Sequence, residues 1–284
     1  MARVVSLINL KGGVAKTTTT VALAETLASQ FGKKILVIDL DPQTNATTIL
    51  LGEKQWKKIN GNGWTLATLF KDALDPENKS FDLKKTLQKG VSDVQGATTV
   101  DLLPSSLDLI DVQDKLASAP TGQFYSVTPI DLLRLAVKPI LDKYDIDLVD
   151  CPPNLGIITL NGLRISEGYI IPTVPDVLST YGIPQIVTRV GNFSKEVGED
   201  IEPLGIVITK YQEASTIHVN VSRDLRRRND PPVFDTVIRQ ANQIAAAAEF
   251  QSERRTLKQK YGYGDLATRY IDLAQELLTR LDME

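Results

Sequence analysis

The segment Asn9-Leu10-Lys11-Gly12-Gly13-Val14-Ala15-Lys16-Thr17-Thr18 is the most informative part of this chain of 284 residues. It follows an apolar run at residues 4–8 and precedes a helix-forming segment at residues 19–30. A buried strand, a glycine-bearing turn and a helix N-terminus build a phosphate cradle, because backbone N–H groups and the positive helix end face the anion. Lys16 is expected to reach the phosphates, and the Thr17 hydroxyl is expected to ligate Mg²⁺.

The cradle departs from the standard pattern G-x-x-x-x-G-K-[ST], because Leu10 and Ala15 stand at the two glycine positions. The pattern that fits is K-G-G-x-x-K-T, with a second lysine, Lys11, at the start of the loop. Lys11 cannot easily serve the same phosphate from the same side as Lys16. Ala15 can meet the backbone requirement of the loop wherever φ is negative. The alternative interpretation is a Gly-Gly turn with two solvated lysines.

Acidic residues follow two other apolar segments at the point where each ends. Residues 33–39 form a predicted strand that ends in Asp39 and is followed by Asp41-Pro42-Gln43. Residues 146–150 form another, which ends in Asp150 and is followed by Cys151-Pro152-Pro153. Ligands collect beyond the carboxyl ends of strands in open α/β sheets, so these carboxylates are expected beside the phosphate cradle. Asp150 is positioned to hold Mg²⁺ directly or through water.

Strand and helix patterns alternate along the remaining chain. Strands are predicted at residues 98–104, 168–174, 203–209 and 233–238, and helices at residues 107–116, 129–144, 183–190 and 266–281. Repeated βα units favour one mostly parallel, twisted sheet with helices on both faces. The sequence therefore predicts a single α/β domain over residues 1–284, with a helical insertion at 52–97 after the second strand that includes the apolar spacing of residues 66–74.

Composition excludes several classes of protein. No apolar run approaches the roughly 20 residues of a membrane-spanning helix, and no signal-peptide pattern follows Met1, so a cytoplasmic protein is expected. The one cysteine, Cys151, and the one histidine, His218, argue against an internal disulfide, a His/Cys metal site and protease chemistry. Cys151 is expected to be a small buried residue, and His218 a surface or loop residue.

Charge is unevenly distributed around a formal net charge of −3. Residues 221–260 carry nine basic and five acidic side chains, a balance of +4 that leaves −7 for the rest. This segment is either a solvated helix face or a surface that contacts DNA phosphates. The candidate DNA-binding residues are Arg223, Arg226, Arg227, Arg228, Arg254 and Arg255.

Four elements in this order resemble the ParA/MinD family of ATPases, which have a deviant Walker A box: residues 11–18, 39–43, 150–153 and the strand end at 205–210. The resemblance implies a P-loop ATPase that hydrolyses ATP slowly with Mg²⁺. It makes Lys16 the phosphate lysine and Lys11 a signature lysine that acts across a dimer interface. Asp41 would orient the attacking water, and Asp39 and Asp150 would support the metal that Thr17 ligates. The nucleotide site would comprise Lys11, Gly12, Gly13, Val14, Ala15, Lys16, Thr17, Thr18 and Lys210.

Soj-like ParA proteins are the most similar branch, and they imply ATP-dependent partitioning of a plasmid or chromosome. An ATP-bound homodimer would bind nucleoid DNA without sequence preference, and a ParB-like partner would stimulate hydrolysis and release. Because the predicted P-loop strand begins the sequence, an N-terminal helix-turn-helix extension and operator binding are not expected. The implied location is the cytoplasm, on the nucleoid.

Other members of the family offer alternatives. An McdA-type ATPase would position a protein cargo such as a carboxysome. A MinD-type switch would end in a membrane-binding amphipathic helix, but residues 277–284 are short, acidic at the tip and without a basic face. A nitrogenase iron protein needs paired cysteines, and no substrate carboxylate site for a dethiobiotin synthetase is evident. By position, Thr209-Lys210 and Val237-Ile238-Arg239 are candidates to flank the adenine.

Overall fold

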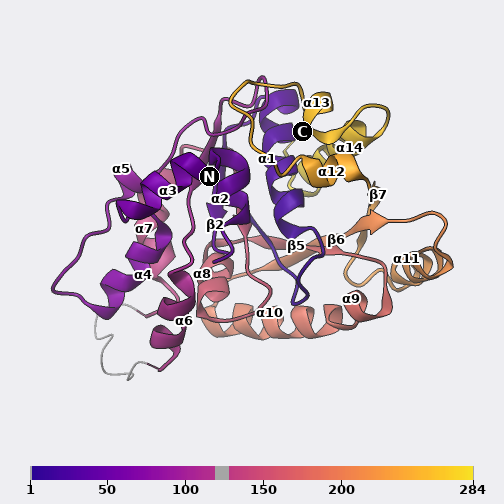
Figure 1. The fold of residues 1–284 in the computed structure, drawn as a ribbon. Coiled ribbons are helices and arrows are strands. Elements are labelled where there is room, and N and C mark those ends of the chain that lie inside the picture. Colours follow the sequence, from indigo (N-terminus) through magenta and orange to yellow (C-terminus); the bar gives the residue numbers. More distant parts are fainter. Residues whose placement is uncertain (1, 119–127, 284) are drawn as a thin grey trace.

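The protein has a central sheet of seven strands that are all paired in parallel, in the order β3-β2-β4-β1-β5-β6-β7 (Figure 1). The computed structural model describes residues 2–118 and 128–283. The strands are β1 (Arg3–Leu7), β2 (Ile35–Asp39), β3 (Val100–Leu103), β4 (Ile146–Asp150), β5 (Gly168–Thr173), β6 (Glu202–Tyr211) and β7 (Val233–Arg239). The predicted α/β fold with a parallel sheet is therefore confirmed.

Helices cover both faces of this sheet, with α1 and α12–α14 on one side and α8 and α10 on the other (Figure 1). The helices in the first half of the chain are α1 (Lys16–Phe31), α2 (Asn45–Leu51), α3 (Glu53–Gly61), α4 (Leu66–Leu74), α5 (Leu83–Thr86), α6 (Leu109–Ser118) and α7 (Leu132–Leu141). Those in the second half are α8 (Ile157–Ile165), α9 (Val177–Tyr181), α10 (Ile183–Val197), α11 (Thr216–Arg228), α12 (Asn242–Ala246), α13 (Leu257–Tyr261) and α14 (Leu266–Arg280). None of the helices in the described ranges is long and apolar enough to cross a bilayer.

Two apolar cores lie on opposite faces of the sheet because successive strand residues point to opposite sides. In β1, Val5 and Leu7 pack with α1 and α14, whereas Val4 packs with the α7–α10 side. All five residues of β2 and all five of β4 are buried, as expected for central parallel strands. Packing of the two cores fixes the positions of β2 and β4, and with them the aspartates at their carboxyl ends, Asp39 and Asp150.

The predicted helical insertion after the second strand is present as α3, α4 and α5, followed by irregular chain that leads to β3. Helix α4 has the predicted bounds, whereas α6 and α7 differ from the predicted ranges by two or three residues at their ends. The sequence patterns did not predict α8, which follows two prolines and contains Gly162. A Cβ atom on Gly162 would lie 2.8 Å from Leu40 and 3.0 Å from Val149, so a larger residue in α8 would force these side chains to shift.

A buried ionic cluster joins α1 to the C-terminal part of the chain. The Lys260 ammonium lies 2.7 Å from Glu25 and 2.6 Å from Asp93, and Arg255 pairs with Asp93 at 2.9 Å. The Tyr261 hydroxyl donates to the second oxygen of Glu25 at 2.6 Å. The prediction that Arg255 contacts DNA is therefore wrong, because its guanidinium is committed to a buried carboxylate. Two of the nine basic residues counted in residues 221–260 are thus internal.

Asp147 on β4 is a buried carboxyl group, and neither of its oxygens has a hydrogen-bond partner in the part of the chain that the structure describes. Burial, with a smaller contribution from Asp142, raises the pKa of Asp147 to about 8. In the unfolded chain this group titrates near pH 4, so between about pH 4 and pH 8 the folded chain retains a proton that the unfolded chain has lost. The free energy of unfolding is therefore expected to fall as pH rises through this range.

The Asp147→Asn variant tests this pH dependence, because its amide does not titrate. Urea unfolding at pH 5 and at pH 8 is expected to show a smaller loss of stability for Asp147→Asn than for the natural chain. Asp111→Asn, at an exposed position on α6, is the control and should keep the natural difference. An equal pH dependence in Asp147→Asn and the natural chain would contradict the assignment.

Candidate active site

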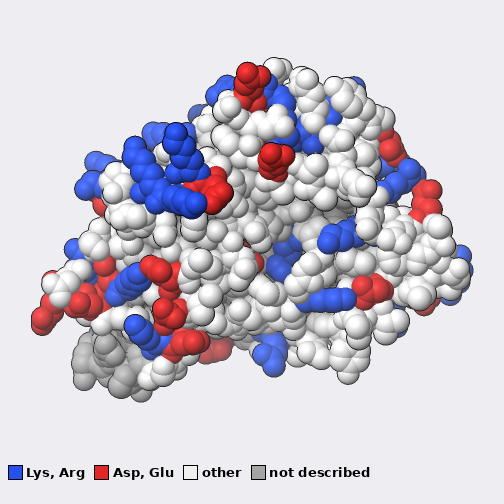
Figure 2. Space-filling model, viewed as in Figure 1, with Lys and Arg blue, Asp and Glu red and all other residues white. Residues whose placement is uncertain are grey.

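A phosphate cradle lies where β1 ends and α1 begins. Helix α1 starts at Lys16, and no side chain of the described residues caps its first turn, so the amides there remain available to an anion. Cβ atoms added to Gly12 and Gly13 would meet nothing within 4 Å, so the loop borders open space. The cavity of about 290 Å³ at this position is lined by Gly12, Gly13, Ala15, Lys16, Thr17, Thr18, Asp41, Gln43, Asn45, Pro153 and Lys210. Figure 2 shows a hollow near the middle of this face, with basic side chains in and beside it.

Backbone strain is concentrated at this cavity. Ala15 has a φ of 64°, in the left-handed region, so the condition under which alanine fits the loop without strain is not met. Lys210 and the β-branched Thr44 also have positive φ, 49° and 58°. Such a conformation costs a non-glycine residue about 1–2 kcal/mol, and it persists where the surrounding structure imposes it. Thr209 helps to impose it, since its hydroxyl donates to the Val14 carbonyl at 2.9 Å.

Lys16 is largely buried inside the loop. Its ammonium donates to the carbonyl oxygens of Asn9 at 3.2 Å and Lys11 at 3.3 Å. Burial lowers the pKa of Lys16, and the nearby Asp150 and Asp41 carboxylates oppose this shift. The Lys16 ammonium is therefore held in the loop by two long hydrogen bonds to neutral carbonyl groups. An ion pair with a phosphate oxygen would be stronger and can replace them.

Asp39 and Asp150 end two paired strands and lie below the cradle. Asp39 accepts hydrogen bonds from the Thr47 amide at 2.9 Å and the Thr47 hydroxyl at 2.6 Å. Asp150 accepts from the hydroxyls of Thr17 at 2.7 Å and Thr20 at 3.2 Å. Burial is the main cause that raises the pKa of Asp150 to about 7, and it raises the pKa of Asp39 with a further contribution from Asp150.

Asp41 lies at the cavity wall, two residues beyond Asp39. Its Oδ1 accepts from the Gln43 amide at 2.9 Å, whereas Oδ2 has no partner among the described residues. Burial raises the pKa of Asp41, and the Gln43 amide and Lys16 partly offset the shift. One carboxylate oxygen thus faces the cavity and is available to a water molecule.

The donor set fits magnesium bound together with a nucleotide. Within residues 2–118 and 128–283, no three carboxylate, cysteine or histidine side chains converge closely enough to hold a metal alone. Mg²⁺ commonly binds through one or two protein oxygens, substrate phosphates and water. The Thr17 hydroxyl, with Asp39 and Asp150 behind it, provides that partial set, and a cation there would offset the mutual repulsion of the two carboxylates.

Lys11 does not line the phosphate cavity, and its side chain is held by the start of α9. Its ammonium lies 3.3 Å from the Asp176 carboxylate and 2.9 Å from the Ser179 hydroxyl. Asp176 also caps α9, because its Oδ1 accepts from the Ser179 amide at 2.7 Å. The first lysine of the motif is thus paired within its own chain and partly exposed.

The structure places most of the predicted site residues together. Among them, Val14 is buried, so only its backbone can face a ligand. Val237 and Arg239 do not line the phosphate cavity but a separate cavity of about 280 Å³, where Arg239 pairs with Glu213 and Asp265. Cys151 is buried and free as predicted, and His218 lies half-buried on α11, where Nδ1 accepts from the Gln212 amide.

Several residues at the site were absent from the predicted set. Gln43, Asn45 and Pro153 line the cavity, Thr47 holds Asp39, and Asp176 holds Lys11. Asp176 could have been predicted from the rule that ligands collect beyond the carboxyl ends of parallel strands, since it follows β5 at the same edge of the sheet. Thr47 carried no such signal, because only the packing of α2 brings it to Asp39.

Comparison with known proteins identifies the family. The family model described as AAA domain matches residues 2–203. The chromosome-partitioning ATPase Soj of Thermus thermophilus is 31% identical over 281 residues, which are 98% of this chain and 96% of that protein. The chain belongs to the ParA/MinD family of ATPases. The family resemblance predicted from the four motif elements is therefore confirmed.

Solved structures agree with the fold of this ParA/MinD-family member. Cobyrinic acid a,c-diamide synthase from Mycobacterium smegmatis, with bound ADP and magnesium, has a TM-score of 0.73 at 25% identity, covering 99% of this chain and 96% of that one. The ATP complex of a Cyanothece McdA variant has a TM-score of 0.73 at 19% identity and covers 100% and 97%, which shows the fold alone. The molecules bound to these proteins agree with the prediction of ATP and Mg²⁺ as cofactors.

Proposed function

We propose that the chain is an ATP-driven switch for DNA partitioning. With ATP and Mg²⁺ it forms a homodimer that binds double-stranded DNA of the nucleoid without sequence preference, and a ParB-like partner stimulates hydrolysis and release. The observation that carries the proposal is the second lysine, Lys11, at the edge of a site whose phosphate position Lys16 already serves. A lysine that does not line its own phosphate cavity suits contact with nucleotide in a second protomer.

The surface beside Lys11 supports dimer formation. Helix α9, which holds Lys11 through Asp176, exposes Val177, Leu178 and Tyr181 at 67%, 77% and 75%. Exposed apolar groups of this size, gathered on one short helix, are typical of an interaction surface. Because α9 is joined to the nucleotide loop through Lys11, the binding of a second protomer to these side chains is expected to depend on the bound nucleotide.

The site residues take separate roles in this proposal. Lys16 and the first-turn amides of α1 would hold the phosphates. Thr17 would ligate Mg²⁺, and Asp39 and Asp150 would support the metal. When bound, Mg²⁺ would neutralise phosphate charge. The free oxygen of Asp41 orients the attacking water. Asp41 is assigned the orientation of the water and not the role of a strong general base. ATP hydrolysis is therefore expected to be slow.

Substitutions at Lys11 and at its partner Asp176 should differ in their effect on the dimer. Lys11→Ala is expected to weaken the ATP-dependent dimer at least tenfold and to leave ATP binding by the monomer within about twofold. Asp176→Asn keeps an N-cap on α9 but removes the charge that holds Lys11, so dimer formation should be unchanged or stronger. Sedimentation with ATP–Mg²⁺ and nucleotide titration measure the two quantities. Equal loss of dimerisation and nucleotide binding in Lys11→Ala would exclude a role across the interface.

The DNA-binding part of the proposal is assigned to α11. Its last turn carries Arg226, Arg227 and Arg228, and this helix protrudes at the edge of the molecule (Figure 1). Arg223 and Arg228 have no ion-pair partner among the described residues, whereas Arg226 is paired with Asp235 at 3.4 Å and Arg227 with Asp224 at 3.9 Å. Arg254 is exposed but belongs to the segment before α13. Unpaired guanidinium groups are free to contact phosphates.

The Arg223→Ala/Arg227→Ala/Arg228→Ala variant is expected to bind unrelated duplex DNA at least tenfold more weakly at low salt, and with a shallower salt dependence. Its matched control is Lys54→Ala/Lys57→Ala/Lys58→Ala, which removes three charges from α3, another exposed helix. Co-elution of each variant with duplex DNA in the presence of ATP–Mg²⁺, at several salt concentrations, measures the affinity and its salt dependence. Equal weakening in the two variants would show a general charge effect, and an ATP-bound dimer that ignores DNA would favour a protein cargo.

A further inference from the structure

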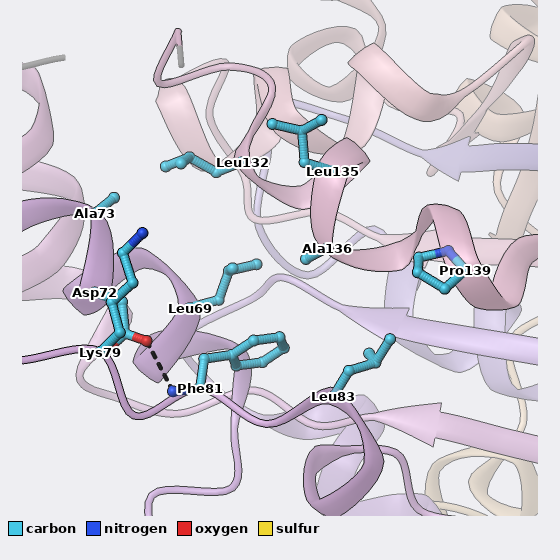
Figure 3. A pocket seen from close by; sticks show the side chains of 10 residues that line it. All are labelled: Leu69, Asp72, Ala73, Lys79, Phe81, Leu83, Leu132, Leu135, Ala136 and Pro139. Carbon is cyan, nitrogen blue, oxygen red and sulfur yellow. Dashed lines mark hydrogen bonds between the residues drawn. The ribbon is translucent and has the colours of Figure 1, made fainter. Parts of the chain in front are cut away.

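A second cavity, of about 470 Å³, lies between α4, the segment that enters α5, and α7. It shares no lining residue with the phosphate cavity. Its walls are mostly apolar: Leu69, Asp72, Ala73, Lys79, Phe81, Leu83, Leu132, Leu135, Ala136 and Pro139. Figure 3 shows Phe81 and Leu83 on one wall, across the cavity from the α7 residues.

Hydrogen bonds join the two parts of the chain that form one wall of the cavity. The Asp72 carboxylate accepts from the amides of Ser80 at 2.9 Å and Phe81 at 2.7 Å, which fixes the segment before α5 relative to α4 (Figure 3). On the opposite side, Pro139 lies inside α7 and has no N–H to donate to the Leu135 carbonyl. Half of the Leu135 side chain remains exposed. Apolar residues of α4, α5 and α7 thus line the cavity while also bordering the core beneath it.

Two side chains of the lining are charged, Asp72 and the exposed Lys79, and they differ in their partners. The Asp72 carboxylate is already bound to two amides, and Lys79 has no ion-pair or hydrogen-bond partner among the described residues. The other lining side chains carry no charge. An unpaired ammonium beside an apolar cavity favours a ligand that brings one negative charge and an apolar body.

We propose that this cavity binds a small amphipathic carboxylate, an aliphatic or aromatic acid about the size of a medium-chain acyl group. Its apolar part lies against Leu69, Phe81 and the α7 side chains, and its carboxylate pairs with Lys79. The volume falls within the roughly 300–1,000 Å³ range of small-molecule sites. Nothing in the proposal depends on the ATP-driven switch, since the two cavities share no residue.

Calorimetric titration of the full chain with decanoate, below the concentration at which it forms micelles, tests the proposal. Saturable binding of one decanoate per chain is expected, with weaker binding of decan-1-ol and of the decyltrimethylammonium cation. Absence of saturable binding up to millimolar decanoate would overturn the proposal. Binding of the cation as tightly as decanoate would also overturn it, because Lys79 would then have no role.

Variants locate the binding at this cavity. Lys79→Met keeps the aliphatic stem and removes the charge, so decanoate should bind roughly fivefold to tenfold more weakly. Lys84→Met, an exposed lysine outside the lining, is the matched control and should bind as the natural chain does. Ala136→Phe, and separately Ala73→Phe from the opposite wall, should abolish binding while ATP binding reports an intact fold. Unchanged binding in both filled variants, or equal affinity of Lys79→Met and Lys84→Met, would place decanoate elsewhere.

Discussion

Asp41→Ala is expected to lower the rate of ATP hydrolysis by about 10²–10³-fold while ATP binding stays within a few-fold. The physical reason is that Asp41 presents one free carboxylate oxygen to the cavity, whereas Lys16 and the α1 amides provide the phosphate contacts. Because hydrolysis is blocked, the ATP-bound dimer should accumulate. Sedimentation and duplex-DNA co-elution with ATP–Mg²⁺, against ADP, should then show a persistent DNA-bound dimer.

Asp41→Asn separates charge from shape in this experiment, since its amide oxygen can still accept from the Gln43 amide. It should be nearly as slow as Asp41→Ala and should bind ATP as well as the natural chain does. Hydrolysis at the natural rate in either variant would mean that another group orients the water. Loss of ATP binding in both would show instead that Asp41 maintains the loop.

Lys260→Met is expected to reduce the free energy of unfolding by about 3–5 kcal/mol. The ammonium of Lys260 is fully buried between Glu25 and Asp93, and its removal leaves one of two neighbouring carboxylates without a cation. Arg255 continues to pair with Asp93, so the uncompensated charge falls mainly on Glu25. Urea unfolding measures the loss.

The matched control is Lys258→Met, an exposed lysine on the same short helix, which should change stability by less than about 0.5 kcal/mol. Adding Glu25→Gln to Lys260→Met should recover part of the loss, because the orphaned carboxylate becomes neutral. Similar stability of Lys260→Met and Lys258→Met would contradict the assigned importance of the cluster.

Local patterns determined the parts of the fold that depend on short stretches of chain. The apolar run before Lys11 and the run that ends in Asp150 predicted buried strands, and parallel strands place their carboxyl ends at one edge. That rule predicted the neighbourhood that the structure has: Lys16, Thr17 and Asp41 line one cavity. Asp150 is buried against the Thr17 hydroxyl, and Asp39 is buried near Asp150. The family also followed from the order of these motifs.

Only the tertiary structure decided which charged residues are internal and how the loop is strained. Arg255 and Arg254 are adjacent in sequence, yet Arg255 is buried against Asp93 and Arg254 is exposed. The pairing of Lys11 with Asp176 and of Lys260 with Glu25 joins residues 165 and 235 positions apart. Sequence spacing carries no record of such contacts, because they arise when helices pack on the two faces of the sheet. The left-handed conformation of Ala15 has the same origin, since the surrounding loop and β6 impose it.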